Sequence, residues 1–207
     1  DAVFSSIDSQ GRYAYGNQPP IAQWNLARLA ETVLPLFNLK PDAAVALAQE
    51  ILEQFADDYT EAYAARMRAK LGLQRDQPGD AALVADFLEG LDKGKLDFTQ
   101  SFARLDPETE TLPPHMTAWT QRWRARLQAE ALSAAEIRAR LHAANPVVIP
   151  RHHQVESALK AAETGDLQPF LAMLNVLRDP LNREFSGHAL AVPPPAGTPP
   201  AVTFCGT

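Results

Sequence analysis

The sequence predicts an all-α fold, on three observations. Apolar residues recur at spacings of three and four through most of the chain, as they do along one face of a helix. No segment alternates apolar and polar residues for long enough to predict a β-strand. Prolines and glycines divide the helical patterns into segments of ordinary helix length. We therefore expect helices joined by loops, without a sheet.

One stretch, GRYAYGNQPPIAQWNLARLAETVLPLF at 11–37, has the strongest pattern. Its lead is rich in turn residues and ends in Pro19 and Pro20, which suit a helix start because a missing N–H has no cost there. The apolar residues that follow occupy more than one helix face, which indicates a helix surrounded by protein. They are Ile21, Trp24, Ala27, Leu29, Ala30, Val33, Leu34, Leu36 and Phe37. We expect a central buried helix over about 20–37, ended or kinked by Pro35.

Trp24 is the largest side chain of this predicted helix, and we expect it to anchor the core. The polar residues around the helix are Asn17, Gln18, Asn25 and Arg28. We interpret them as buried groups that hydrogen-bond loops to the helix, and we assign them no catalytic role.

Further helices follow in order. They are expected over 41–71, 80–91, 98–105, 116–127, from 133 onward, over 152–164 and over 167–178. Gly72 should end the first of these, Asp80 can cap the second, and Ser133 with Glu136 forms a capping box. The last two are separated only by Gly165 and its neighbours, so they should pack as a hairpin.

Bulk composition limits the classes of partner. The 207 residues are 46% hydrophobic with a net charge of −6 and a pI near 5.4, which argues against a nucleic-acid surface. No run of 18 apolar residues predicts a membrane span. We expect neither nucleic acid nor membrane as a partner, and a cytoplasmic protein. A single cysteine excludes an internal disulfide and fits a reducing compartment.

The two ends of the chain differ from its middle. The opening DAVFSSID indicates the inside of a longer protein, so we expect this chain to be a fragment. We interpret 1–20 as a looped lead, 20–180 as one helical core and 181–207 as a proline-rich tail ending in FCGT. Within that tail, AVPPPAGTPPAV at 191–202 is polyproline-like and should lie on the surface.

Two groups of side chains could suggest a metal or acid-base site. His152 and His153 are adjacent, so on a helix they point about 100° apart and cannot hold one ion as an i, i+4 pair would. Asp57, Asp58 and Glu61 lie on a long predicted helix, where such a cluster is usually a solvated face. We therefore expect neither group to be functional.

The segment RWRAR at 122–126 combines arginines with aromatic residues and could suggest RNA stacking. The spacing of Trp119 and Trp123 instead places both inward, with Arg122, Arg124 and Arg126 mostly facing away. No glycine-rich phosphate loop occurs in the sequence.

Cys205 is the one residue singled out as a redox candidate. It lies in FCGT at the end of the tail, where a thiol would be accessible, whereas structural cysteines are normally buried. The alternative is that the Cys205 thiol has no functional role. The residues alone thus describe a helical domain without a recognisable active site.

Three blocks resemble the C-terminal part of the selenoprotein O family. The first runs over 3–36 and contains GRYAYGNQPPIAQWNLARLAETVLPL, the second is NPVVIPRHHQVESALKAAETGDLQPFLAMLNVLRDP at 145–180, and the third is TFCGT at 203–207. They follow the family's order and span the chain from end to end.

The resemblance implies the helical C-lobe of a protein-kinase-like fold. Members of the family transfer AMP from ATP to Ser, Thr or Tyr hydroxyls of proteins, with Mg²⁺ or Mn²⁺. The motifs for nucleotide and metal lie N-terminal to this chain, so no catalytic, nucleotide-binding or metal-binding residue is carried over to it. By the same resemblance 1–20 belongs to an activation-segment-like region, and Cys205 matches a redox position. The usual asparagine of IPRNH is replaced by His152.

Two hypotheses follow. In the first, this is the C-terminal part of a bacterial protein adenylyltransferase, inactive alone, whose partners are protein substrates and the N-terminal kinase-like part of the same protein. In the second, it is a stand-alone, non-catalytic helical interaction module.

Overall fold

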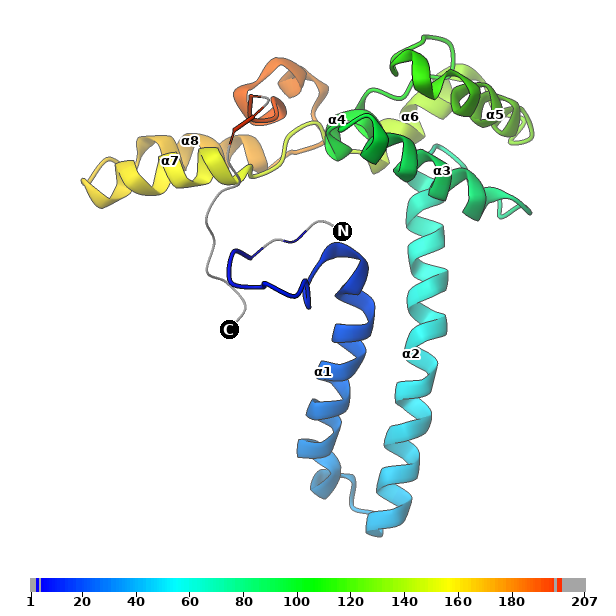
Figure 1. Cartoon of the computed structure of the whole chain (residues 1–207), viewed down its shortest axis with the longest axis vertical. Coiled ribbons are helices and arrows are strands. Elements are labelled where there is room, and N and C mark those ends of the chain that lie inside the picture. The colour runs from blue at the N-terminus through cyan, green and yellow to red at the C-terminus, as the bar shows by residue number, and fades with distance from the viewer. Residues whose placement is uncertain (1–2, 4, 196, 199–207) are drawn as a thin grey trace. The chain divides into compact units, whose positions relative to one another are not determined.

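A computed structural model describes residue 3, residues 5–195 and residues 197–198. None of these residues is in a β-strand, which confirms the all-α prediction (Figure 1). The α-helices are α1 (Gln18–Val33), α2 (Pro41–Lys70), α3 (Asp80–Lys93), α4 (Phe98–Ala103), α5 (Thr117–Gln128), α6 (Ala134–Ala144), α7 (His152–Glu163) and α8 (Gln168–Leu177). The 3₁₀ turns are η1 (Tyr15–Asn17), η2 (Leu34–Phe37), η3 (Pro114–Met116), η4 (Arg183–Gly187) and η5 (Ala189–Ala191). None of the described helices is both long and apolar enough to cross a bilayer.

The described residues divide by their contacts into two compact units. The first ends at Tyr63 and the second begins at Ala64, so the boundary falls within α2. The predicted arrangement as a single helical region with a lead and a tail stays a prediction.

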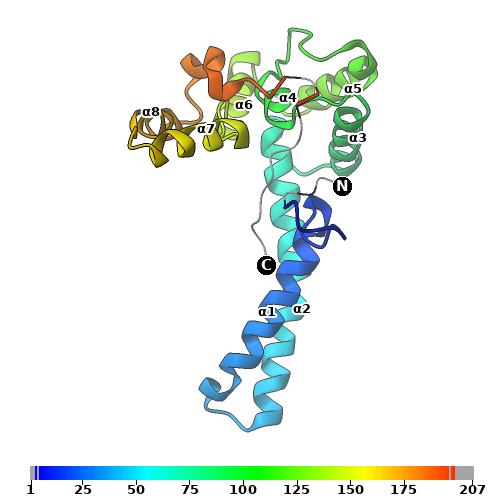
Figure 2. The same cartoon turned by 60° about the vertical axis from the view of Figure 1, so that its left-hand side comes forward.

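The first unit is an antiparallel hairpin of α1 and the early part of α2 (Figures 1 and 2). As predicted, α1 begins at the double proline, with proline in its first turn. Pro35 lies in η2, and Asn38 then adopts a left-handed conformation with φ of 50°. Across the hairpin, the side-chain amide of Gln23 donates to the Leu52 carbonyl at 3.1 Å.

The prediction that α1 is a buried central helix is wrong for this chain. No residue of α1 is buried; 48% of Trp24 and 57% of Leu29 are exposed. Among the described residues of its unit, α1 has only α2 and the flanking turns beside it, and these cannot cover a helix that is apolar on several faces. Trp24 instead lies beside the guanidinium groups of Arg12 and Arg28, 4.8 and 5.5 Å from its ring centre.

The polar residues near α1 are exposed and not buried as predicted. Two of them do tie the lead to the helix. The Asn17 side chain donates to the Gly11 carbonyl at 2.8 Å, and the Gln18 side chain donates to the Tyr13 carbonyl.

The second unit has its main core between α3, α5, α6 and the end of α2. The Trp119 and Trp123 rings stack with centroids 5.7 Å apart, and both are buried, as the seam predicted. Their indole N–H groups donate to the carbonyls of Leu83 and Leu71 at 2.8 and 2.9 Å. The rings therefore fill the core without leaving a buried donor unpaired.

The end of α2 and the start of α6 follow the predicted signals. Gly72 ends α2 with φ of 75°, a conformation that suits glycine. Ser133 and Glu136 form the predicted capping box at the start of α6. Residues 98–103 form α4 within the predicted 98–105 segment.

Arg126 lies at the centre of an ion cluster that the sequence did not predict, and its two carboxylate partners, Asp80 and Glu130, are buried. Its Nε is 2.7 Å from Asp80 and its Nη1 is 2.7 Å from Glu130. The Glu130 carboxylate also accepts from the Gln74 N–H at 3.1 Å. Two predictions are corrected: Arg126 does not face away, and Asp80 is the first residue of α3 after Gly79 and makes no cap. Burial of these charges is tolerated because each is paired.

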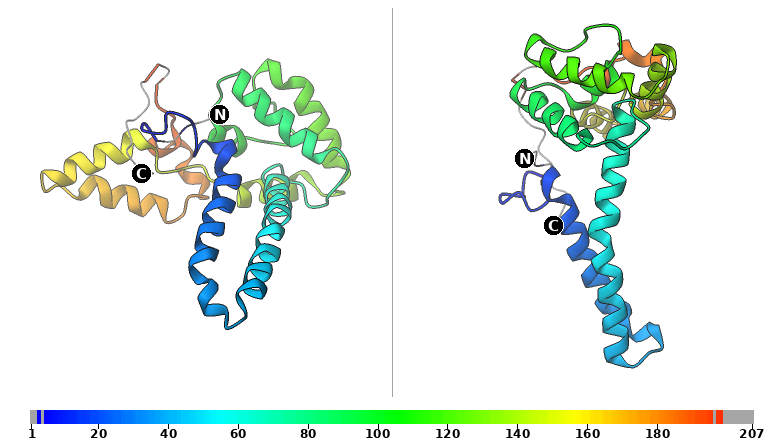
Figure 3. Two further views of the ribbon diagram at one scale, coloured as in Figure 1. Left: turned by 60° about the horizontal axis from the view of Figure 1, so that its bottom comes forward. Right: turned by 90° about the vertical axis from the view of Figure 1, so that its right-hand side faces the viewer.

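A second, smaller core lies between α8, the segment before α7 and the η5 turn. It consists of Val147, Val148, Val176, Leu190 and Ala191. Residues 145–150 are outside any helix as predicted, and α7 and α8 pack as the predicted hairpin, turning at Gly165 with φ of 90° (Figure 3). The prediction that 191–202 lies on the surface is wrong at its first residue, because Ala191 is buried in this core beside Leu190.

The two tryptophans give a matched test of these burial assignments. We expect Trp123→Ala to lower the free energy of unfolding by about 3 to 5 kcal/mol, because Trp123 is almost fully buried. Trp24→Ala should cost less than about 1.5 kcal/mol, because half of Trp24 is exposed. Urea unfolding followed by circular dichroism measures both. Equal losses would contradict the assignment.

Candidate pocket on the α7–α8 hairpin

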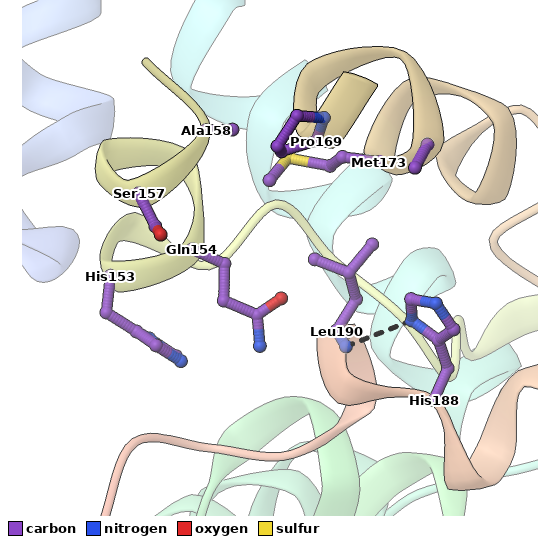
Figure 4. Close-up of a pocket in the computed structure, with 9 residues that line it drawn as sticks. His153, Gln154, Ser157, Ala158, Pro169, Met173, His188 and Leu190 are labelled. Carbon is purple, nitrogen blue, oxygen red and sulfur yellow. Dashed lines mark hydrogen bonds between the residues drawn. The ribbon is translucent and has the colours of Figure 1, made fainter. Parts of the chain in front are cut away.

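A pocket of about 370 Å³ lies between α7, α8 and the segment that ends in η5 (Figure 4). It is lined by His153, Gln154, Ser157 and Ala158 from α7, Pro169, Ala172 and Met173 from α8, and His188 and Leu190 from the final turn. An apolar floor with a few convergent polar groups is typical of ligand sites. We regard this pocket as the candidate functional site.

The polar side of the pocket comes from one turn of α7. His153 and Ser157 are four residues apart and so lie on the same helix face, with Gln154 beside them. The Gln154 Nε2 donates to the Ala189 carbonyl at 2.6 Å, which leaves its amide oxygen as an acceptor. Within the described part of the chain, neither His153 nor Ser157 has a side-chain hydrogen bond.

The apolar side comes from α8 and the last turn. Pro169 and Met173 are four residues apart and line the pocket together (Figure 4). Ala158 and Leu190 are both 2% exposed and form its deepest part. Since the helices are held by packing at these positions, the pocket is preformed.

His188 lies at the far end of the pocket and caps η5. Its Nδ1 accepts the Leu190 N–H at 3.1 Å, so that nitrogen carries no proton. In the neutral ring Nε2 therefore carries the hydrogen. His188 is a donor at Nε2 and cannot also be a base at Nδ1 while this bond is present.

The turn that carries Leu190 is fixed by the Arg151 side chain. Arg151 makes a bidentate pair with Asp97 at 2.8 and 3.1 Å, and it donates to the carbonyls of Leu190 and Ala191 at 3.2 and 3.3 Å. Asp97 in turn caps α4 by accepting the Gln100 N–H at 2.8 Å. One guanidinium thus ties the pocket's final turn to α4.

The pKa of Asp97 reflects this arrangement. Burial acts to raise it, but the hydrogen bonds from Arg151 and from the Gln100 N–H outweigh burial and hold the pKa below its ordinary value. The carboxylate therefore stays charged in the folded protein to lower pH than it would in the unfolded chain.

Comparison with known proteins decides the family. The family model described as "Protein adenylyltransferase SelO" matches residues 2–178. The chain belongs to the SelO family. This confirms the resemblance that the three sequence blocks indicated.

Several curated bacterial proteins named "Protein nucleotidyltransferase YdiU" are relatives of this SelO chain. The protein from Rhodopseudomonas palustris (strain BisB5) is 44% identical over 218 residues, that from Cereibacter sphaeroides (strain KD131) 46% over 215, and that from Geobacillus kaustophilus 42% over 213. The alignments cover 99%, 99% and 100% of this chain, and 44% of each relative. The chain therefore spans less than half the length of these relatives.

The family block NPVVIPRHH contains both Arg151 and a pocket residue. His153 lines the pocket, whereas its neighbour His152 is exposed and does not. Among the residues that the structure describes, no group of three or more His, Cys, Asp or Glu is arranged to hold a metal ion. Cys205, the redox candidate, lies outside the described residues.

The acidic residues Asp57, Asp58 and Glu61 are exposed on α2, as expected of a solvated face. Of the polar residues at this candidate site, sequence reasoning considered His153 but missed Gln154, Ser157, His188 and the supporting Arg151. A positive signal for Arg151 was its place between a proline and a helix start in the family block. Nothing local marked His188, because its neighbours in the pocket come from α7 and α8.

Replacing Arg151 tests the fixation of this turn. We expect Arg151→Met to lower the free energy of unfolding by about 3 kcal/mol at pH 7, because it leaves Asp97 partly buried without its partner. The folded-state pKa of Asp97 is depressed, so the stability from this pair is present above its unfolded pKa of about 4 and is lost as pH falls. The difference between the two proteins should therefore shrink below pH 4 in urea titrations.

The control is Lys93→Met, which removes an exposed pair with Glu89. It should leave the free energy of unfolding nearly unchanged, because an exposed ion pair contributes little to stability. If Arg151→Met lowers the free energy of unfolding by the same amount at every pH, the aliphatic part of Arg151 stabilises the fold by packing and its charge does not contribute.

Proposed function

We propose that this chain is the helical, C-lobe-like part of a kinase-like fold in an enzyme that transfers AMP from ATP to Ser, Thr or Tyr hydroxyls of bacterial cytoplasmic proteins. Membership of the SelO family over residues 2–178 carries this proposal. In it, ATP and Mg²⁺ or Mn²⁺ are held by the other part of the enzyme. This chain supplies scaffold and a surface for protein substrates.

The exposed apolar surface of the first unit supports a partner within the same protein. Large hydrophobic side chains of α1, η2, the loop after η2 and the start of α2 are between 39% and 78% exposed: Trp24, Leu26, Leu29, Leu36, Leu39, Val45, Leu47 and Ile51. Monomeric proteins rarely leave such a patch uncovered. We propose that the N-terminal, kinase-like part of the enzyme packs on it. The relatives, more than twice as long as this chain, have the length to supply that part.

Transfer of a nucleotide is tested on the family-length protein. Incubated with ATP, Mg²⁺ or Mn²⁺ and a mixture of bacterial proteins, it should add the mass of one adenylyl group to hydroxyl side chains, as read by peptide mass spectrometry. Parallel reactions with UTP decide which nucleotide is used.

The 207-residue chain alone is the control. It should label no protein, and calorimetry should detect no metal-dependent ATP binding. Tight, Mg²⁺-dependent binding of ATP to this chain alone would contradict the proposed division between the two parts. Failure of the family-length protein to label any protein would favour a stand-alone interaction module.

We also propose that Cys205 tunes the parent enzyme by thiol-disulfide exchange with a cysteine of the N-terminal part, because it is the single cysteine of this sequence. In that case Cys205→Ser should make nucleotide transfer insensitive to added dithiothreitol, whereas the wild-type rate changes with reductant. The measurement is the rate of adenylylation in reduced and oxidised samples. An equal response to reductant in both proteins would refute the role.

A further inference from the structure

A second pocket, which we call the α4 pocket, lies in the second unit and has a volume of about 240 Å³. One face of α4 lines it, because Asp97, Gln100, Ser101 and Arg104 follow one another at helical spacing from the N-cap residue onward. Its other walls come from the loop between α3 and α4, the segment before η3 and the segment after η5. It shares no lining residue with the α7–α8 pocket.

The Ser101 hydroxyl is the group in this pocket that points to a ligand. Ser101 is only 7% exposed and lines the pocket, yet among the residues that the structure describes its side chain makes no hydrogen bond. The buried hydroxyl of Thr120 on α5 behaves differently, because it donates to the Met116 carbonyl of its own helix at 3.1 Å. Buried polar groups in native proteins are nearly always paired. The Ser101 hydroxyl is therefore placed to bind a group that enters the pocket.

The carboxylate in the lining of the α4 pocket is already satisfied. Arg151 donates to the two oxygens of Asp97 at 2.8 and 3.1 Å, and the Gln100 N–H donates to Oδ1 at 2.8 Å. Burial acts to raise the pKa of Asp97, but these hydrogen bonds and the positive charges of Arg151 and Arg104 hold it below its ordinary value. Asp97 thus stays charged without a hydrogen bond from Arg104.

Two cations in the lining have charge to offer a ligand. The Arg104 side chain makes no hydrogen bond or ion pair with the part of the chain that the structure describes. Lys95 pairs with Asp92 at 2.9 Å, but both of these side chains are more than 80% exposed, and such a pair is weak. An anion in the pocket gains both positive charges, whereas a cation gains no unpaired carboxylate.

The polar groups of the lining suit a tetrahedral oxyanion. Besides the guanidinium of Arg104 and the ammonium of Lys95, the pocket has the hydroxyls of Ser101 and Thr111. These four groups come from three different segments, so they approach a bound ion from different sides. A phosphate group has oxygens in all these directions, whereas a carboxylate has only two.

The size and the apolar part of the lining limit what the phosphate is attached to. Pockets for drug-sized ligands begin at about 300 Å³, so a nucleotide exceeds this volume of about 240 Å³. Leu96, Leu112 and Pro193 line the remainder of the pocket and suit a short apolar substituent. A small phosphate monoester matches both parts.

We propose that the α4 pocket binds the phosphate group of a small ligand, either the free ion or a short monoester. Arg104 and Lys95 supply the positive charge, and Ser101 and Thr111 donate their hydroxyls to the phosphate oxygens. The site goes beyond the proposed function and does not rest on it, because no step of nucleotide transfer is assigned to these residues.

The probes are inorganic phosphate, ethyl phosphate and acetate, each titrated into the full 207-residue chain at constant pH and ionic strength and followed by NMR. The Arg104 Nε–H and Thr111 methyl resonances should shift saturably with either phosphate, with a dissociation constant on the order of 1 mM. Acetate should bind at least roughly tenfold more weakly, because it has fewer oxygens and less charge. Tighter binding of ethyl phosphate than of inorganic phosphate would identify the ligand as a monoester, and the reverse order would identify the free ion.

Two variants and a control locate the bound ion. Arg104→Gln should weaken phosphate binding at least roughly tenfold. Arg66→Gln removes the same charge from an exposed position of α2 outside the pocket, and it should leave binding unchanged. Ser101→Ala should weaken binding roughly fivefold. Without phosphate, Ser101→Ala should not lower the temperature of thermal unfolding, because the hydroxyl has no partner among the described residues.

Four results would overturn the proposal. Equal binding of acetate and phosphate would show that any anion associates with this surface. Unchanged binding in Arg104→Gln, or an equal loss in Arg66→Gln, would place the ion elsewhere or leave only the net charge as its cause. A lower unfolding temperature of Ser101→Ala without phosphate would show that the hydroxyl already has a partner within the fold. Failure of nucleotide transfer in the family-length protein would not alter any of these titrations.

Discussion

The hydrogen bonds of the Arg151 guanidinium hold together segments that are far apart in the sequence. It pairs with the carboxylate that caps α4, 54 residues earlier, and it donates to carbonyls of the η5 turn about 40 residues later. A planar cation with five donors suits this task, because it can bind a carboxylate with two N–H groups and still reach two carbonyls. The second core and the α7–α8 pocket both depend on the η5 turn, because Leu190 belongs to both.

Local signals made much of the fold predictable. The capping box at Ser133, the glycine that ends α2, the Trp119–Trp123 seam and the α7–α8 hairpin all depend on residues within a few positions of one another. Such features follow from helix periodicity and helix-end chemistry, which a single sequence displays directly. These features could therefore be predicted from the sequence alone.

Contacts between side chains that are far apart in the sequence could not be predicted in this way. Arg126 reaches Asp80 across 46 residues, and its charge led to the expectation of an outward side chain. A buried charge is stable only when a partner is present, and the sequence does not state which carboxylate that is. His188 was missed for the same reason, since the pocket it completes is lined by residues of two earlier helices.

The error at α1 has a different cause. Its apolar residues occupy several helix faces, but periodicity reports what a helix can pack against, not whether that partner lies within the chain. Among the described residues of the first unit α2 is the one long helix beside it, and about half of Trp24 is exposed. A chain that covers 44% of its relatives' length can carry a helix whose covering surface is encoded elsewhere. The α7–α8 pocket differs in this respect, because its floor, polar edge and fixed turn all come from this chain.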